Sequence, residues 1–334
     1  MSRSVFLSAG GDVFLADFVL SLWKNRWYDE IDTMYVGYNN NAQVPLETAY
    51  EFVRKWECDP KVRIIYTPHG VGNGTPIAQM LLNSKEEHLM LLEDDGFIFT
   101  PGIVDDWFNK VEQDTIDVVG SLRYSVGEVA ESAKQKYNLD YSGEGDKGFG
   151  WWPNFFLCSR DLLLKTDLDF GSKKYPAGKY FKELDYTFIN DDYTDTFTWA
   201  SIQLRYLGTQ FYGGVGLRSY DIPQNHAHPY DLENMRNQGV MFAKGNPQYI
   251  HGGSLSSGWG GYLNTVLPPV STDMEKQDIE TRVAMWGICC EETQGYMGFK
   301  FEYSHKLNYL IDDCNLDRDR INKKEQLYRN LMHI

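Results

Sequence analysis

Three consecutive acidic residues follow an apolar run in the first third of the chain. Glu93, Asp94 and Asp95 come directly after Met90, Leu91 and Leu92. Three carboxylates in a row repel one another unless water, hydrogen-bond donors or a cation compensates their charge. A hard divalent ion bridging carboxylate and diphosphate oxygens would supply that compensation. Spacing alone explains the triplet equally well as a metal site or as a solvated acidic turn.

Other polar side chains could join such a site. His226 and His228 are separated by one residue, so both imidazoles can approach one ion, although a surface loop without metal also explains them. Asp191 and Asp192 come just before a helical pattern, where carboxylates commonly cap the helix N-terminus. Each pair therefore has a functional and a structural interpretation.

Small residues near the amino terminus form a third candidate segment. Ser8, Ala9 and Gly10 let the backbone approach a ligand closely, and Asp12 either contacts that ligand or caps the next helix. Trp152 has an aromatic face that suits the apolar surface of a sugar ring, although core packing is the commoner role of tryptophan.

These residues need a scaffold, and short apolar runs alternate with amphipathic helical patterns through the first half of the chain. That alternation favours βαβ units and an α/β fold with a largely parallel sheet. We expect strands at Val5–Ala9, Thr33–Gly37, Val62–Tyr66, His88–Leu92, Val118–Leu122 and Phe155–Cys158. Because ligands of such sheets bind outside the carboxyl ends of the strands, the triplet after the fourth strand is well placed for function.

Helix signals lie between these runs. Asp12 precedes one helix, and Pro45 opens a second that carries Leu46, Ala49, Tyr50 and Val53 on one face. We expect Thr75 to cap a third helix before Pro76, a helix over 195–207 that ends at Gly208, and a last helix near 321–331. The pattern loosens after about residue 215, so we expect a core over 1–215 and a C-terminal extension over 216–334 that completes the functional site.

Composition disfavours several classes of protein. The 47 acidic and 32 basic residues give a formal net charge of −15, which opposes non-specific attraction to nucleic acid or anionic membranes. The apolar runs are too short for a signal sequence or a membrane span. The five cysteines lack CxxC spacing, so we expect a soluble protein in a reducing, cytoplasmic compartment.

Taken in order, four segments resemble the GT-A glycosyltransferases, especially those related to the large inverting GT2 group. They are the strand Ser4–Ser8, the Gly-rich stretch His69–Gly74, the segment Leu91–Phe97 and the turn Thr100–Gly102. The resemblance covers roughly residues 4 to 210, with an EDD-type triplet in place of a plain DxD motif. It implies a Rossmann-like GT-A fold with a mixed, mainly parallel sheet, a nucleotide diphosphate sugar as the donor, and Mn²⁺ or Mg²⁺ as the metal.

The resemblance also implies roles for the acidic residues. Asp95 would be the direct metal ligand, Glu93 would contact ribose or metal-bound water, and Asp94 would contact the donor sugar or position the metal. The cluster around Asp192 resembles the ED motif, whose carboxylate removes the proton of the acceptor hydroxyl in inverting enzymes. Asp192 is the first candidate base and Asp191 the second.

The remaining candidates bind the donor or the metal in the same family pattern. Ser8, Ala9, Gly10 and Asp12 lie where the family holds the base and ribose, and Asn39 stands where an Asp often contacts the base. Trp152 would approach the donor sugar. His226 or His228 would complete the metal coordination.

The acceptor is left open as a glycan, a protein, a small molecule or a modified base in DNA. A glycosyltransferase that acts on hydroxymethylated bases needs only one basic groove, which a negative net charge does not exclude. A sugar nucleotidyltransferase would need a basic phosphate loop near the amino terminus, and Ser8 to Asp12 contains no Lys or Arg. A third alternative is a non-catalytic carbohydrate-binding protein with a GT-A-like core.

Overall fold

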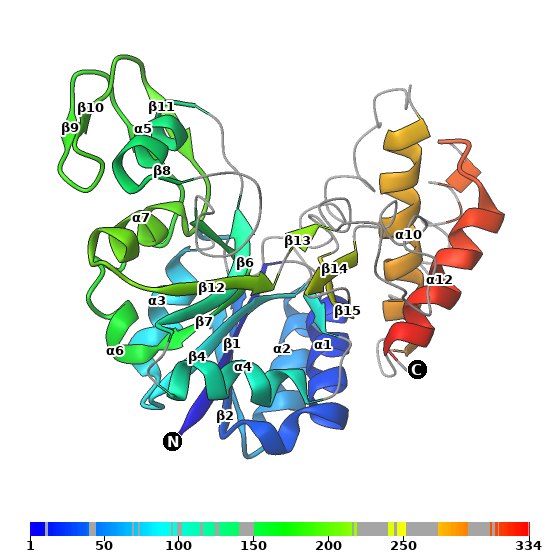
Figure 1. Ribbon diagram of the computed structural model, residues 1–334. Helices are drawn as coiled ribbons and strands as arrows, with labels where there is room; N and C mark the ends of the chain where they lie inside the picture. Colours follow the sequence, from blue (N-terminus) through cyan, green and yellow to red (C-terminus); the bar gives the residue numbers. More distant parts are fainter. Residues whose placement is uncertain are drawn as a thin grey trace.

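The computed structural model describes residues 1–10, 13–39, 45–68, 70–72, 74–94, 96–98, 102–113, 116–123, 127–139, 150–215, 217–218, 240–243, 246–251, 273–292, 308, 311–312, 314–332 and 334. A seven-stranded sheet forms the centre, in the order β12-β6-β7-β4-β1-β2-β3 (Figure 1). Its strands are β1 (Arg3–Ala9), β2 (Thr33–Asn39), β3 (Val62–Thr67), β4 (His88–Glu93), β6 (Val118–Arg123), β7 (Gly150–Ser159) and β12 (Phe211–Val215).

The strand directions confirm an α/β fold with a mixed, mainly parallel sheet. β1 is parallel to β2 and β4, β2 is parallel to β3, and β12 is parallel to β6. β7 is antiparallel to both β4 and β6, so β4 and β6 run in the same direction. The carboxyl ends of β1, β2, β4 and β6 therefore meet at one edge of the sheet.

Helices cover both faces of this sheet because side chains alternate between the faces along each strand. On one face, Leu7 and Leu92 belong to a buried cluster with α1, α2 and α4. On the other face, Phe6 and Leu91 belong to a cluster with α3, α6 and α7. These helices are α1 (Val13–Arg26), α2 (Leu46–Glu57), α3 (Gly74–Asn83), α4 (Ile103–Glu112), α6 (Arg160–Leu163) and α7 (Thr198–Tyr206).

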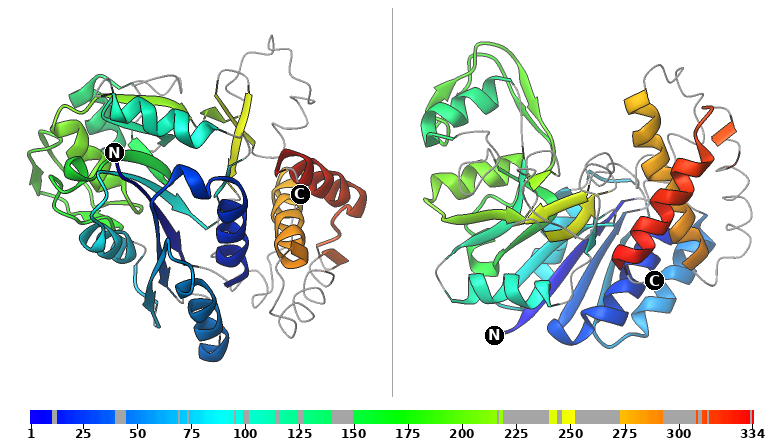
Figure 2. Two further views of the ribbon diagram at one scale, coloured as in Figure 1. Left: turned by 90° about the horizontal axis from the view of Figure 1, so that it is seen from below. Right: turned by 45° about the vertical axis from the view of Figure 1, so that its right-hand side comes forward.

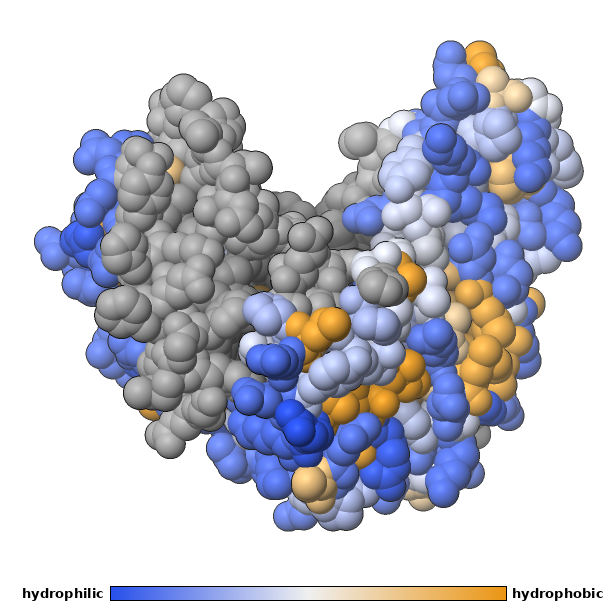
Figure 3. Space-filling view, turned by 180° about the vertical axis from the view of Figure 1, so that it is seen from behind, coloured by the Kyte–Doolittle hydropathy of each residue, from blue (hydrophilic) through white to orange (hydrophobic). Residues whose placement is uncertain are grey.

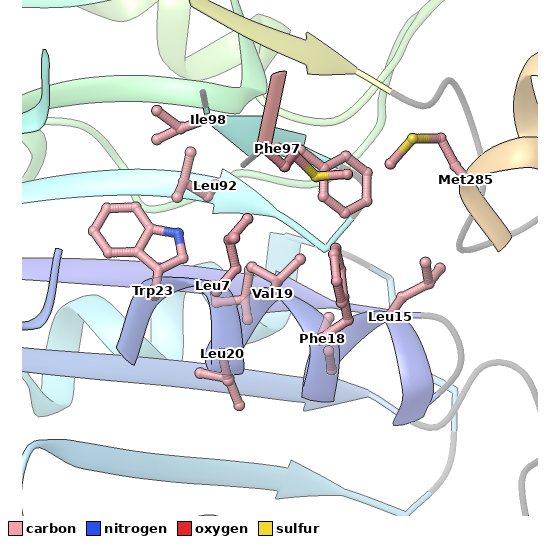
Figure 4. Packing of buried hydrophobic residues seen from close by; sticks show 14 of the residues in the cluster. Leu7, Leu15, Phe18, Val19, Leu20, Trp23, Leu92, Phe97, Ile98 and Met285 are labelled. Atoms are coloured by element: carbon pink, nitrogen blue, oxygen red, sulfur yellow. The ribbon is translucent and has the colours of Figure 1, made fainter. Parts of the chain in front are cut away.

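The C-terminal part packs beside α1. Helices α10 (Asp273–Glu292) and α12 (Arg318–Met332) lie side by side, with α10 against α1 (Figures 1 and 2). Phe97 of strand β5 (Gly96–Ile98) lies between Phe18 of α1 and Met285 of α10 (Figure 4), and the Phe18 and Phe97 ring centroids are 5.8 Å apart. One continuous core thus joins α10 and α12 to the central sheet. None of the helices in the described ranges is long and apolar enough to cross a membrane.

A separate lobe stands at the upper left of Figure 1. It contains α5 (Glu128–Tyr137) and the short strands β8 (Lys173–Tyr175), β9 (Tyr180–Phe181), β10 (Tyr186–Thr187) and β11 (Asp192–Thr194). β8 pairs with β11, and β9 pairs with β10. Aromatic rings fill its core: Tyr175 lies 4.9 Å from Phe181 and 5.1 Å from Phe188, centroid to centroid.

An ion-pair network lies at the amino end of β1, opposite the edge at which the carboxyl ends of the strands meet. Arg3 of β1 donates from Nε to Glu112 Oε1 at 2.6 Å and from Nη1 to Asp105 Oδ1 at 2.5 Å, and both acceptors belong to α4. Its guanidinium also lies 5.0 Å from the Phe108 ring centroid. These contacts fasten α4 to the amino end of β1.

The expected strands and the helices after residue 12, over 46–57 and near 321–331 are confirmed, with differences in extent. The second strand was expected to end at Gly37, but Tyr38 and Asn39 also belong to β2, where they lie opposite Tyr66 and Thr67. β7 begins at Gly150, so Trp152 lies within the strand rather than before it.

Three helix predictions were wrong in detail. The buried face of α2 carries Ala49, Phe52 and Trp56, because this face packs against the sheet. Leu46 and Tyr50 are exposed. α3 begins at Gly74, so Thr75 is not its cap. α7 begins at Thr198, after strand β11, and Gly208 follows it with a φ of +78°.

Candidate functional site

An acidic turn, which begins with Glu93 and Asp94, starts where β1 and β4 end side by side. Ser8 lies opposite Glu93 in the parallel ladder, and the backbone N–H of Asp94 donates to the Ser8 carbonyl at 3.1 Å. Asp94 is only 1% exposed, Ser8 and Ala9 are buried, and Glu93 is half-buried. The structure thus brings together the ends of two strands that the sequence placed 85 positions apart.

Three polar residues at this edge lie on the same face of the sheet. Glu93 is two residues beyond Leu91 and Ser8 two beyond Phe6, and both of those residues pack in the cluster with α3. Asn39 is four residues beyond Tyr35, which belongs to the same cluster. Asn39, Ser8 and Glu93 therefore form a polar row at the ends of β2, β1 and β4 on the α3 face, in which Asn39 lies two positions beyond Gly37, the residue opposite Ser8.

Asn39 is buried and holds the loop that follows β3. Its Nδ2 donates to the Val71 carbonyl, and the Val71 N–H donates to its Oδ1 at 3.0 Å. Both ends of the amide are therefore bonded to the Gly-rich segment 70–72. The sequence pattern marked that segment as a loop but gave no sign of its partner.

A histidine that sequence analysis missed lies beside the acidic turn. Strand β15 (Asn246–His251) pairs antiparallel with β5, and its register places His251 opposite Gly96, two positions after Asp94. β15 also pairs with β14 (Val240–Ala243), which pairs in turn with β13 (Leu217–Arg218). The sequences of β14 and β15 are separated by two residues, which suits a hairpin. Nothing in the local sequence indicated that β15 would pair with β5.

The second acidic pair lies in the lobe. Asp192 Oδ2 accepts from the backbone N–H of Val129 at 3.0 Å, and its Oδ1 accepts from the Tyr193 N–H at 2.8 Å. Ala177 N–H donates to Asp191 Oδ1 at 2.8 Å, and Asp191 is exposed. The capping interpretation of Asp192 thus holds for α5 rather than for the helix that follows it in sequence.

Glu128, at the start of α5, forms hydrogen bonds with the turn between β10 and β11. Its two carboxylate oxygens accept from the backbone N–H groups of Ile189 at 3.1 Å and Asn190 at 3.0 Å, and Oε1 also accepts from the Tyr186 hydroxyl. Partial burial, together with the charge of Glu128, raises the pKa of Tyr186. Glu128 and Asp192 therefore clamp α5 and the β10–β11 turn to each other.

The lobe lies at the edge of the sheet where the carboxyl ends of β4 and β6 meet. α5 begins five residues after Arg123, the last residue of β6, and β6 ends at the same edge as β4. Trp152 is near the start of the antiparallel strand β7, so its backbone lies at that edge too, since Gly150 lies opposite Arg123. The described surface of the lobe is mostly hydrophilic (Figure 3), but it exposes Tyr180, Ile189 and Tyr193.

Four predicted site residues, Asp12, Asp95, His226 and His228, lie outside the described residues. Gly10 directly follows β1 at the site edge. Within the described ranges, no cluster of three or more His, Cys, Asp or Glu side chains could hold a metal ion.

The donor chemistry at the acidic turn nevertheless fits a hard divalent cation. Glu93 and Asp94 carry carboxylate oxygens, Asp95 is next in sequence, and β15 places the backbone of His251 opposite Gly96.

No protein-family model matches the chain, and no curated protein sequence matches it. Similar solved structures include S. aureus TarS 1–349, at 10% identity and a TM-score of 0.43, covering 99% of this chain and 92% of that one. Another is the mannosyltransferase PcManGT from Pyrobaculum calidifontis in complex with GDP-Man and Mn²⁺, at 10% identity and a TM-score of 0.42, covering 99% and 85%.

A third similar structure is glucosyl-3-phosphoglycerate synthase from Mycobacterium tuberculosis in complex with Mn²⁺, UDP-Glc and phosphoglyceric acid. It is 17% identical, with a TM-score of 0.33, and the match covers 48% of this chain and 57% of that one.

Proposed function

We propose that this protein is a metal-dependent glycosyltransferase that moves a sugar from a nucleotide diphosphate sugar to an acceptor hydroxyl. The observation that carries the proposal is the pairing of Ser8 with Glu93 at the carboxyl edge, with the buried Asp94 immediately after it. Open α/β sheets bind their ligands at this edge. An acidic turn there suits a metal-bound diphosphate.

The donor would occupy the polar row on the α3 face. Ser8, Ala9 and Gly10, together with Asp12, would lie along the nucleoside, and Glu93 and Asp94 would face the ribose and the donor sugar. Asp95 and Glu93 are the proposed carboxylate ligands of Mn²⁺ or Mg²⁺. When bound, the metal would neutralise the charge that develops on the leaving diphosphate.

A histidine from the C-terminal part would complete the metal site. His226, His228 and His251 are the candidates, and the pairing of His251 with Gly96 favours His251. Replacing each of the three with Ala separates them, because loss of a ligand raises the Mn²⁺ concentration needed for half-maximal activity. We expect a shift of about tenfold or more for His251→Ala and none for the other two; three unchanged variants would exclude a histidine ligand.

The chemical step would be a single displacement with inversion. The acceptor oxygen attacks the anomeric carbon as the bond from that carbon to the diphosphate oxygen breaks, and the hydroxyl proton moves to a carboxylate. A base must reach the acceptor by a hydrogen bond. The oxygens of Asp192 are directed at Val129 and Tyr193, so we favour Asp191 as the base.

The proposal is tested by nucleoside diphosphate release from a panel of nucleotide sugars with Mn²⁺, followed for wild type and Asp95→Asn. Asp106→Asn is the matched control, because Asp106 is an exposed acidic residue of α4 away from the site. We expect release by wild type and Asp106→Asn and almost none by Asp95→Asn. Equal activity of all three would contradict the metal assignment, and no release from any donor would contradict the transferase.

A further inference from the structure

Asn39 ends β2 at the proposed donor site, and it is 1% exposed. Its backbone lies opposite Thr67, the last residue of β3. A buried amide must satisfy its N–H donors and its carbonyl acceptor within the protein. The group that bonds to the Asn39 amide therefore helps to fix the local structure at the end of β2.

That partner is the backbone of Val71, four residues beyond the end of β3. The Asn39 amide donates to the Val71 carbonyl and accepts from the Val71 N–H at 3.0 Å. This reciprocal pair of hydrogen bonds resembles the pair that two backbone residues of neighbouring strands exchange. It extends the contact between β2 and the β3–α3 connection past the point where the ladder stops.

The other end of this connection is also fixed. Gly74, the first residue of α3, packs so closely on Phe170 and Gly171 that an added Cβ would lie 2.5 Å from the Gly171 Cα. Residues 70–72 are thus held by Asn39 on one side and lead into a helix start held against the segment that precedes β8. They lie on the α3 face of the sheet, on the same side as Ser8 and Glu93.

We infer that Asn39 is a positioning residue for the donor: it holds segment 70–72 as a wall of the site for the nucleoside of a nucleoside diphosphate, and does not itself read the base. This inference rests on the proposed function and assigns the nucleoside contact to the loop backbone. It requires an amide at position 39. A carboxylate could still accept from the Val71 N–H, but it would set a charged oxygen against the Val71 carbonyl.

The test compares Asn39→Asp and Asn39→Ala with the control Thr67→Val, which alters the residue across the ladder. Calorimetry measures the Kd of UDP and GDP in the presence of Mn²⁺, and steady-state assays give donor KM, acceptor KM and kcat. For Asn39→Asp we expect the Kd of the nucleotide that wild type binds, and the donor KM, to rise tenfold or more. Acceptor KM and kcat should stay within about twofold, and Thr67→Val should resemble wild type.

A second variant covers the case in which Asn39→Asp does not fold. Val71→Pro leaves Asn39 intact and removes the N–H that it accepts from, so it should raise the same two constants. A folded Asn39→Asp protein with unchanged nucleotide Kd and donor KM would overturn the inference alone. Failure of wild type to bind any nucleoside diphosphate with Mn²⁺ would overturn it together with the proposed function.

Discussion

The carboxylate of Asp192 accepts a hydrogen bond from the backbone N–H of Val129 at 3.0 Å, although the two residues are 63 positions apart. Val129 lies in the first turn of α5, where N–H groups have no partner within the helix. Asp192 therefore caps α5 from the β10–β11 side of the lobe. This bond and its counterparts from Glu128 join α5 to the β10–β11 turn within the lobe.

Removing this cap should destabilise the protein without changing its core. We expect Asp192→Ala to lower the free energy of unfolding by about 1 kcal/mol, and Asp192→Asn to lower it less, since Asn also accepts from a helix N-terminus. Urea denaturation measures the effect. Glu131→Ala on the same helix is the control, because its exposed ion pair with Lys134 contributes little. Equal losses for Asp192→Ala and Glu131→Ala would show that the cap is energetically unimportant.

The two acidic residues of the lobe should separate in a kinetic comparison. Asp191→Asn is expected to reduce kcat by about 100-fold or more while leaving donor KM nearly unchanged, as loss of a general base does. Asp192→Asn should retain most of the turnover because its bonds are to the backbone. If Asp192→Asn reduced kcat more than Asp191→Asn did, Asp192 would be the base instead.

The close approach of α3 to the segment before β8 should make Gly74 hard to replace. A Cβ at Gly74 would overlap the backbone of Gly171, and backbone atoms cannot move aside as the end of a side chain can. We expect Gly74→Ala to cost about 3 kcal/mol of stability. Gly72→Ala serves as the control, since a Cβ there meets nothing within 4 Å. Thermal unfolding of both variants checks the difference, and matching melting temperatures would refute the contact.

The Arg3 network should give a pH-dependent contribution to stability. Hydrogen bonds from Arg3 hold the pKa of Asp105 and of Glu112 below their ordinary values. Their contribution is therefore complete above the unfolded-state pKa of about 4 and is lost as the pH falls through the lower folded-state values.

The variant Arg3→Gln isolates this contribution. It should be less stable by about 2 kcal/mol at neutral pH, a moderate figure because Asp105 is half exposed. The difference from wild type should shrink below about pH 4. A difference that is constant from pH 7 to pH 3 would mean that the ion pairs do not contribute it.

Local patterns predicted the strands and the place of Glu93 and Asp94 at the end of β4, because buried parallel strands are recorded in the sequence as apolar runs. They failed where long-range packing decided the outcome. Tyr38 and Asn39 are polar enough to suggest a loop, yet β3 extends alongside them and keeps them in β2. The Asp192 cap and the His251–Gly96 pairing join segments far apart in sequence, and no spacing rule encodes either.

The central claim is that the acidic turn binds a nucleotide diphosphate sugar through a divalent metal. Thermal unfolding with UDP-sugars and GDP-sugars, each with and without Mn²⁺, tests it most directly, because a ligand that binds only the folded state raises Tm. We predict that at least one nucleotide sugar raises Tm with Mn²⁺ but not with a chelator, and that Asp95→Asn removes this rise. An identical rise in Asp95→Asn, or no rise with any nucleotide sugar, would contradict the claim.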